Sequence, residues 1–100
     1  KIKTFEPEDA GETFLVRFVD IDINGHVNNS KYPNFVMNSL NLGEDETIKT
    51  FQIDYRHELR AGSTVRIHSK REGNVITSMG ISTEGETAGE CMFATQIELA

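Results

Sequence analysis

The sequence predicts an α+β domain in which one central helix lies on an antiparallel sheet of about five strands. Three observations support this class. Several stretches alternate apolar and polar residues with the period of a strand, one stretch has apolar residues at helical spacing, and turn residues separate the later stretches. The chain has 100 residues, a length that suits one domain, and we expect residues 1–100 to form it.

The first two elements are predicted to be a strand over residues 11–19 and a helix over residues 30–40. In the strand, the alternating apolar residues are Phe14, Val16 and Phe18. In the helix, one face collects Tyr32, Phe35, Val36, Ser39 and Leu40. Pro33 suits the first helical turn, where a missing N–H costs little, and Gly43 is the expected stop.

Four further strands complete the predicted sheet. The first alternates Phe51, Ile53, Tyr55, His57 and Leu59, and the second contains Val65, Ile67 and Ser69. The turn residues 72–74 lead to a third strand over residues 75–81, and the last strand carries Cys91, Phe93, Thr95, Ile97 and Leu99 on one face. This alternation predicts Cys91 in the core, His57 in the core or an interface, and His68 on the solvent side.

Composition limits the classes of function. The apolar fraction of 37% is low for so small a chain, so we expect a second domain or subunit to complete the core. The net charge of −6 argues against nucleic-acid binding, and no apolar run reaches the roughly 18 residues that would cross a membrane. Residues 1–9 lack the apolar stretch of a signal peptide, and a single cysteine cannot form an intrachain disulfide. These features predict a cytoplasmic protein.

The basic residues are unevenly spread. Half of the ten fall between positions 56 and 71, and they are Arg56, Arg60, Arg66, Lys70 and Arg71. One interpretation is a solvated face of the sheet. The other is a landing site for an anionic carrier, such as a partner that bears phosphopantetheine.

The segment between the first strand and the helix carries the candidate chemistry. Residues 22–29 contain Asp22, Asn24, His26, Asn28 and Asn29. A helix start leaves backbone N–H groups free to hold a developing negative charge, so the segment offers an acid/base group beside an oxyanion site. Ordinary turn and capping chemistry explains Asn28 and Asn29 but not the spacing of Asp22, Asn24 and His26.

Metal sites fit this segment poorly. Residues 20–25 match the opening of a calcium loop, but the twelfth position is Lys31 where such a loop needs a bidentate Glu. His57 and His68 have no zinc-ligand spacing to His26. We therefore predict no metal.

Two separate blocks resemble a known family. Residues 22–29, Asp-Ile-Asn-Gly-His-Val-Asn-Asn, followed by Lys31-Tyr32, resemble the signature of the acyl-acyl-carrier-protein thioesterases of the hotdog superfamily. Residues 54–58, Asp-Tyr-Arg-His-Glu, resemble that family's Tyr-Arg-x-Glu block. The resemblance covers nearly the whole chain and implies a single hotdog domain, equivalent to the C-terminal of the two repeats in such enzymes.

The resemblance implies an enzyme that hydrolyses fatty acyl thioesters, releases a free fatty acid and needs no cofactor. Carried over by position, the catalytic set is Asp22, Asn24, His26 and Glu58. Either Glu58 or Asp22 is the general base, and N–H groups near Asn28 and Asn29 would bind the oxyanion. The position after the Glu, where a nucleophilic Cys has been invoked in this family, is Leu59 here, which excludes a thiol mechanism at that place.

Alternatives remain open. Single-hotdog acyl-CoA thioesterases share a similar helix-start segment and work as homo-oligomers, so coenzyme A is the second candidate carrier. A non-catalytic module that binds acyl thioesters is the third reading. Strict alternation also places Glu58 on the polar side of its strand, unless a bulge near Ala61-Gly62 or a partner subunit changes its surroundings.

Overall fold

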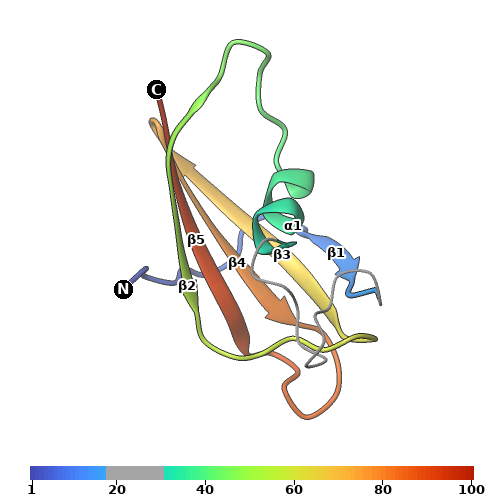
Figure 1. Ribbon diagram of the computed structural model, residues 1–100. Helices are drawn as coiled ribbons and strands as arrows, with labels where there is room; N and C mark the ends of the chain where they lie inside the picture. The colour runs from blue at the N-terminus through green and yellow to red at the C-terminus, as the bar shows by residue number, and fades with distance from the viewer. Residues whose placement is uncertain (18–30) are drawn as a thin grey trace.

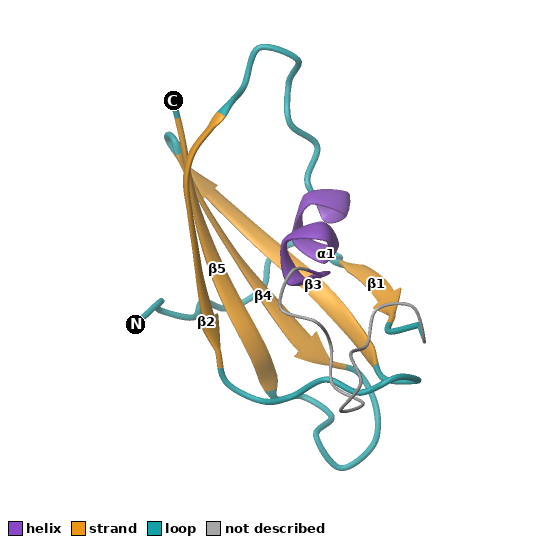
Figure 2. Ribbon diagram, viewed as in Figure 1, coloured by secondary structure: helices purple, strands orange, loops and turns teal. Residues whose placement is uncertain are grey.

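The computed structural model describes residues 1–17 and 31–100 of the chain, which form one helix and a five-stranded antiparallel sheet (Figures 1 and 2). In chain order the elements are β1 (Glu12–Leu15), α1 (Tyr32–Ser39), β2 (Ile48–Tyr55), β3 (Thr64–Glu72), β4 (Val75–Ser82) and β5 (Cys91–Leu99). The strands lie in the order β1-β3-β4-β5-β2. The predicted fold class, one helix with about five antiparallel strands, is confirmed.

The three central strands, β3, β4 and β5, are neighbours in the sheet because short connections join them in sequence. β3 and β4 pair from Glu72↔Val75 to Val65↔Ser82 across a tight turn in which Gly73 has a φ of +61°, a value that suits glycine. β5 follows β4 as the third strand of this meander. The two edge strands come from the first half of the chain, because β1 pairs with β3 and β2 pairs with β5.

α1 lies against one face of the sheet and buries one side (Figure 1). Its buried residues are Tyr32, Phe35 and Val36, as the helical spacing predicted, and Pro33 lies in its first turn. These side chains share a core with Val65 and Phe93. Phe93 also fills the space above Gly80, where an added Cβ would lie 2.3 Å from the ring, so this close approach requires glycine.

The helix ends earlier than the sequence predicted. Leu40 is already extended, and its N–H still bonds to the Met37 carbonyl at 3.3 Å. Gly43 therefore does not stop the helix, and it lies instead in a turn closed by the Glu46 N–H. At eight residues, α1 is too short to cross a membrane, and no other helix occurs in residues 1–17 and 31–100.

Residues 1–10 cross the face of the sheet opposite α1 (Figure 1), and we call them the N-terminal strap. Ile2 is buried and its carbonyl accepts a 2.6 Å hydrogen bond from Arg56 Nη2. Asp9 lies 2.7 Å from His68 Nδ1 and accepts a hydrogen bond from the Ser69 N–H. The side chain of His68 is only 12% exposed, so the prediction that it faces solvent is wrong because the strap covers it.

Cys91 lies on the face covered by the strap. Gly80 pairs with Phe93 but Ile81 pairs with Cys91, so Met92 is an extra residue in β5. This bulge turns Cys91 to the face of Ile81, where its half-buried thiol lines a cavity beneath strap residues 4–7. The prediction that Cys91 shares the face of Phe93 is therefore wrong. Burial raises the pKa of the Cys91 thiol, which favours its neutral form.

Candidate functional site

Glu58 lies in an irregular segment between β2 and β3. β2 ends at Tyr55, and the N–H groups of Arg56 and His57 both bond to the Met92 carbonyl at 3.0 Å. Two donors on one acceptor interrupt the ladder, so the strand does not continue to Leu59 as predicted. The segment then turns at Gly62, whose φ is +87° and whose N–H bonds to the Val16 carbonyl at 2.9 Å.

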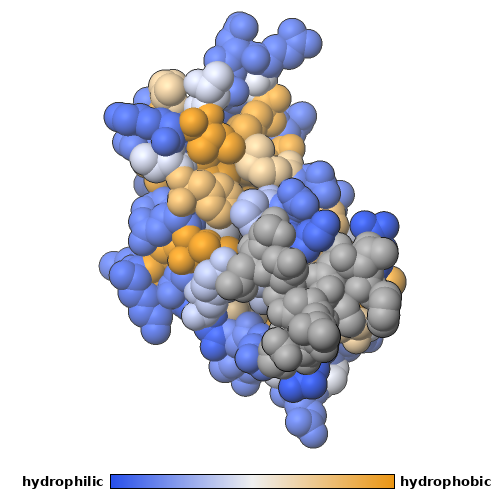
Figure 3. All heavy atoms as spheres, in the orientation of Figure 1, coloured by the Kyte–Doolittle hydropathy of each residue, from blue (hydrophilic) through white to orange (hydrophobic). Residues whose placement is uncertain are grey.

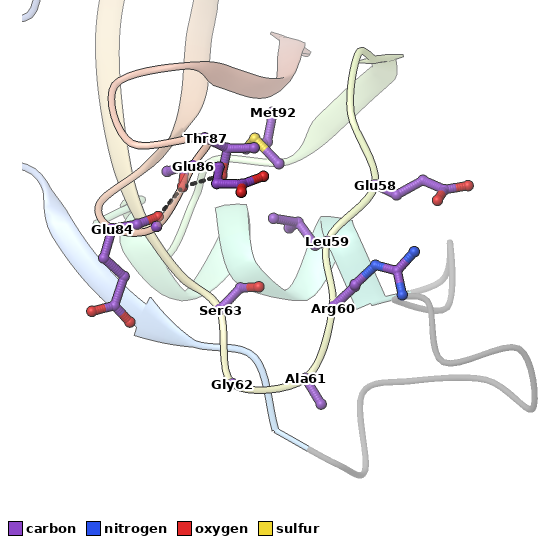
Figure 4. Close-up of a pocket in the computed structure, with 12 residues that line it drawn as sticks. Glu58, Leu59, Arg60, Ala61, Gly62, Ser63, Glu84, Glu86, Thr87 and Met92 are labelled. Carbon is purple, nitrogen blue, oxygen red and sulfur yellow. Dashed lines mark hydrogen bonds between the residues drawn. The ribbon is translucent and has the colours of Figure 1, made fainter.

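Glu58 and Leu59 point in opposite directions. Leu59 is buried, with 1% of its surface exposed, and its side chain is directed toward α1, whereas Glu58 projects outward (Figure 4). Glu58 is exposed, as the alternation predicted. A turn, not a bulge, occupies Ala61-Gly62, and the interruption of the ladder lies at Arg56–His57, before Glu58.

A cavity of about 640 Å³ lies beside Glu58. One wall is the segment 58–63, and the other is the loop 84–87 that follows β4 (Figure 4). That loop is held by Ser82 Oγ, which lies 2.8 Å from Thr87 Oγ1 and donates to the Glu84 carbonyl at 3.2 Å. The residues of this loop carry no sequence signal of a cavity wall.

The cavity combines apolar and charged groups. Leu59 and Met92, both buried, form apolar parts of its lining, and Glu58, Arg60 and Glu86 add charge. Glu58 and Arg60 extend from the same side of their segment (Figure 4). The arrangement can therefore accept the uncharged part of a ligand near a carboxylate at the cavity edge.

The other predicted site residues lie outside the described residues. Asp22, Asn24 and His26 of the catalytic set, and Asn28 and Asn29 of the predicted oxyanion site, belong to residues 18–30. Of the six predicted site residues, only Glu58 lies within the part of the chain that the structure describes. The described chain resumes at Lys31, which precedes α1 and provides no side-chain cap to the first helical turn.

Tyr32 joins α1 to the Glu58 segment. Its ring meets those of Tyr55 and Phe93 edge-on, with centroids 5.0 Å apart in each case. Burial raises the pKa of the Tyr32 phenol, the Leu59 backbone opposes that rise and the Glu58 carboxylate adds to it. The phenol is therefore neutral. From the sequence, Tyr32 was predicted to lie on the buried helix face and to belong to the family signature, with no role of its own in the site.

His57 is not a core residue. Its side chain is 51% exposed, and its Nε2 lies 3.6 Å from Glu90. The prediction of a core position is therefore wrong, because His57 is one of the two bulge residues at which the regular alternation ends.

Comparisons with known proteins agree with this fold. The family described as "Acyl-ACP thioesterase C-terminal domain" matches residues 5–98. No curated protein sequence matches the chain. Among solved structures, an acyl-ACP thioesterase from Bacteroides thetaiotaomicron superposes with a TM-score of 0.80 at 20% identity, over 100% of this chain and 40% of that one.

Two further structures show the same fold. The 12:0-ACP thioesterase from Umbellularia californica superposes with a TM-score of 0.83 at 21% identity, over 100% of this chain and 39% of that one. A hypothetical protein from Staphylococcus aureus, solved in complex with CoA, gives a TM-score of 0.79 at 14% identity, over 95% of this chain and 77% of that one. The chain thus spans about two fifths of the two acyl-ACP thioesterases and shares the fold of the part that it matches.

Proposed function

Because the chain belongs to the family of acyl-ACP thioesterase C-terminal domains, we propose that it hydrolyses fatty acyl thioesters, with acyl-acyl carrier protein (acyl-ACP) as the favoured substrate. The products are a free fatty acid and the carrier thiol. The observation that carries this proposal is the family match over residues 5–98, which includes both blocks of the predicted site. The cavity beside Glu58 supports it with room for the end of a carrier arm.

The proposed reaction is attack by water on the thioester carbonyl. Glu58 or Asp22 takes a proton from the water while its oxygen bonds to the carbonyl carbon. Asn24 and His26 orient the water or polarise the carbonyl, and N–H groups near Asn28 and Asn29 hold the oxyanion. The tetrahedral intermediate then breaks its C–S bond, and the thiolate leaves and takes up the proton.

Replacing each carboxylate by its amide tests this mechanism. We expect Glu58→Gln or Asp22→Asn, whichever removes the base, to lower kcat by about 10²–10⁴-fold, the usual contribution of a general base. Glu72→Gln is the control, because Glu72 is an exposed carboxylate at the end of β3, outside the cavity lining, and should keep the wild-type rate. Full activity in either test variant excludes that carboxylate as the base.

The proposal also chooses between two carriers of the acyl chain, acyl carrier protein and coenzyme A. Four of the five clustered basic residues have polar partners: Arg56 pairs with Asp54, Arg66 with Thr13, Lys70 with Glu72 and Arg71 with Glu46. Arg60 lines the cavity beside Glu58 and is our candidate for contact with an anionic carrier arm. Assays with the same acyl chain on acyl carrier protein and on coenzyme A compare the two carriers, and a higher kcat/KM with the acyl-CoA substrate would contradict our preference.

The second candidate is an acyl-CoA thioesterase that works as a homo-oligomer. The observation that favours it is the likeness to the CoA-bound Staphylococcus aureus protein, most of whose length this chain spans. A non-catalytic acyl-thioester-binding module is the third possibility. It would bind acyl thioesters tightly without hydrolysing them.

We also propose a partner for the open edge of the sheet, either a second copy or a second hotdog repeat. β2 pairs only with β5 among the described strands, and such edges invite pairing with another chain. Figure 3 shows apolar atoms gathered in the upper half of the molecule. Partly buried or exposed apolar residues come from β2, from the end of α1 and from the segment that follows it: Met37, Leu40, Leu42, Ile48, Phe51 and Ile53. A cytoplasmic site of action suits the single unpaired cysteine.

A further inference from the structure

Arg56 belongs to the same sequence block as Glu58, but its side chain lies on the face of the sheet that the N-terminal strap covers. It lines the cavity beneath the strap, whereas Glu58 lines the cavity of about 640 Å³ described above. Residues two positions apart would share one face of a regular strand. The chain therefore turns between Arg56 and Glu58, and the direction of Glu58 depends on what fixes this turn.

The guanidinium of Arg56 is held by two partners. Its Nε and Nη2 donate to Asp54 Oδ2 at 3.2 Å and 3.1 Å, and Nη2 also donates to the Ile2 carbonyl of the strap at 2.6 Å. The side chains of Arg56 and Asp54 are only 21% and 22% exposed. Water screens such a pair less than an exposed one, and its hydrogen bonds are charge-assisted. These contacts therefore hold the Arg56 side chain in one orientation.

The backbone of Arg56 is held as well. The N–H groups of Arg56 and His57 both bond to the Met92 carbonyl at 3.0 Å, directly after the end of β2. These two residues form the bulge, so one of them is fixed through both its backbone and its side chain. Glu58 follows directly after the bulge and projects outward (Figure 4). The bulge is thus the support from which the Glu58 side chain extends.

We propose that Arg56 is a positioning residue for Glu58: by holding the bulge in place, it sets the direction in which the carboxylate is presented to its cavity. This inference rests on the proposed thioesterase function and on Glu58 as its base. It differs from a landing site for an anionic carrier, because the guanidinium of Arg56 already binds Asp54 and the Ile2 carbonyl. Loss of Arg56 should therefore slow the chemical step more than it weakens substrate binding.

The test is steady-state kinetics of the full chain with acyl-ACP and acyl-CoA substrates. Arg56→Gln removes the guanidinium that joins Asp54 to the strap. We expect kcat to fall by on the order of tenfold to hundredfold, the effect of a small misplacement of a reacting group, while KM stays near the wild-type value. A wild-type kcat would overturn the inference. A change confined to KM with the acyl-ACP substrate would also overturn it, since that is the result a landing site for the carrier predicts.

Arg56→Lys keeps the test decisive if Arg56→Gln does not fold. Lysine keeps a positive charge beside Asp54, but its ammonium lacks the planar fork that holds two acceptors in one orientation. We expect a smaller fall in kcat at unchanged KM, and where only this variant folds, a wild-type kcat in it would overturn the inference. Arg71→Gln is the matched control: Arg71 also pairs with a carboxylate, that of Glu46, but it lies on β3 outside the cavity lining and should leave both constants unchanged.

The double variant Arg56→Gln/Glu58→Gln shows whether Arg56 acts through Glu58. A positioning role predicts that the double variant is no slower than Glu58→Gln alone. A further fall in kcat by the factor seen in the single Arg56→Gln variant would overturn the inference. Hydrogen exchange gives a second readout that does not depend on activity: the His57 amide, which bonds to the Met92 carbonyl, should exchange faster in Arg56→Gln, and an unchanged rate would also overturn the inference.

Failure of this inference can be distinguished from failure of the proposed function. If Arg56→Gln keeps the wild-type kcat while Glu58→Gln is inactive, the role of Arg56 is overturned and the thioesterase function stands. If Glu58→Gln is fully active, Glu58 is not the base and the role of Arg56 falls with it. If the wild-type protein hydrolyses neither substrate, the proposed function itself is overturned.

Discussion

At the scale of single residues, a row of three hydroxyls crosses the buried face of the sheet. Ser69 on β3 pairs with Ser78 on β4, and Ser78 pairs in turn with Thr95 on β5. The Ser69 and Ser78 hydroxyls lie 2.7 Å apart and satisfy each other. Thr95 is fully buried, and within residues 1–17 and 31–100 its hydroxyl has no hydrogen-bond partner. An unpaired buried hydroxyl lowers the stability of a fold.

Thr95→Val is therefore expected to raise the free energy of unfolding by about 1 kcal/mol, because it replaces the hydroxyl by a methyl group of similar shape. Urea denaturation of both proteins measures the change. Ser78→Ala is the opposite control, since it deprives Ser69 of its partner and should lower stability by a similar amount. A destabilised Thr95→Val variant would mean that the hydroxyl has a partner in the folded protein.

Part of the candidate site could be predicted from single residues of the sequence. Residue types and spacing within residues 22–29 indicated a function, and the match of a second block singled out Glu58. The exposure of Glu58 followed from simple alternation. The cavity wall at residues 84–87 could not be predicted, because it depends on the folded path of a loop whose composition is ordinary for a turn.

At the scale of elements, the N-terminal strap is fastened to β3 by Asp9. Its carboxylate accepts bonds from His68 and from the Ser69 N–H, on the part of β3 that extends beyond its pairing with β1. Partial burial alone would raise the pKa of Asp9, but these bonds together outweigh it and hold the pKa below the ordinary value of 3.8. The folded protein therefore favours the ionised form.

Because the folded state lowers this pKa, the stabilisation from Asp9 is present above the ordinary value of 3.8 and is lost as the pH falls through the folded value below it. We expect Asp9→Asn to be less stable than the wild type at neutral pH and to approach it as the medium becomes more acidic. Urea denaturation over a pH series measures this difference. A difference that does not change across that acid range would contradict a role for the ionised carboxylate.

The elements also show where sequence patterns stop being informative. Alternation located β3 and β5, and the turn residues 72–74 located the start of β4. Two errors, the end of β2 and the face of Cys91, occur at Met92, whose carbonyl accepts two N–H groups and which is the extra residue of β5. A bulge shifts the alternation by one residue and leaves no mark in the composition, so both errors have one cause.

At the scale of the whole molecule, the two edges of the sheet differ in their surroundings. Ile48 on β2 is 39% exposed, and the same strand carries Phe51 and Ile53, which are only partly buried against the core. Leu15 on β1, at the opposite edge, is 56% exposed. If the β2 edge is the interface, a charge at position 48 must be buried on association and one at position 15 need not be.

Ile48→Lys is therefore expected to weaken association by about 2 kcal/mol or more, roughly thirtyfold in the dissociation constant, whereas Leu15→Lys should leave it unchanged. Size-exclusion chromatography with light scattering over a concentration series measures this for copies of the chain. For a second repeat, the same measurement uses the chain mixed with that repeat. Equal effects of the two substitutions would contradict the choice of edge.

The order of the strands has a consequence for the timing of folding. β3, β4 and β5 are neighbours in sequence and in the sheet, so they can assemble through local contacts. β1, α1 and β2 leave the ribosome earlier, but β2 has no strand to pair with until β5, ending at Leu99, has been made. The apolar residues of the first half thus remain exposed to solvent until β5, which helps to bury them, has been synthesised. Protection from aggregation during that interval, rather than the stability of the finished fold, is then expected to limit the yield of folded protein.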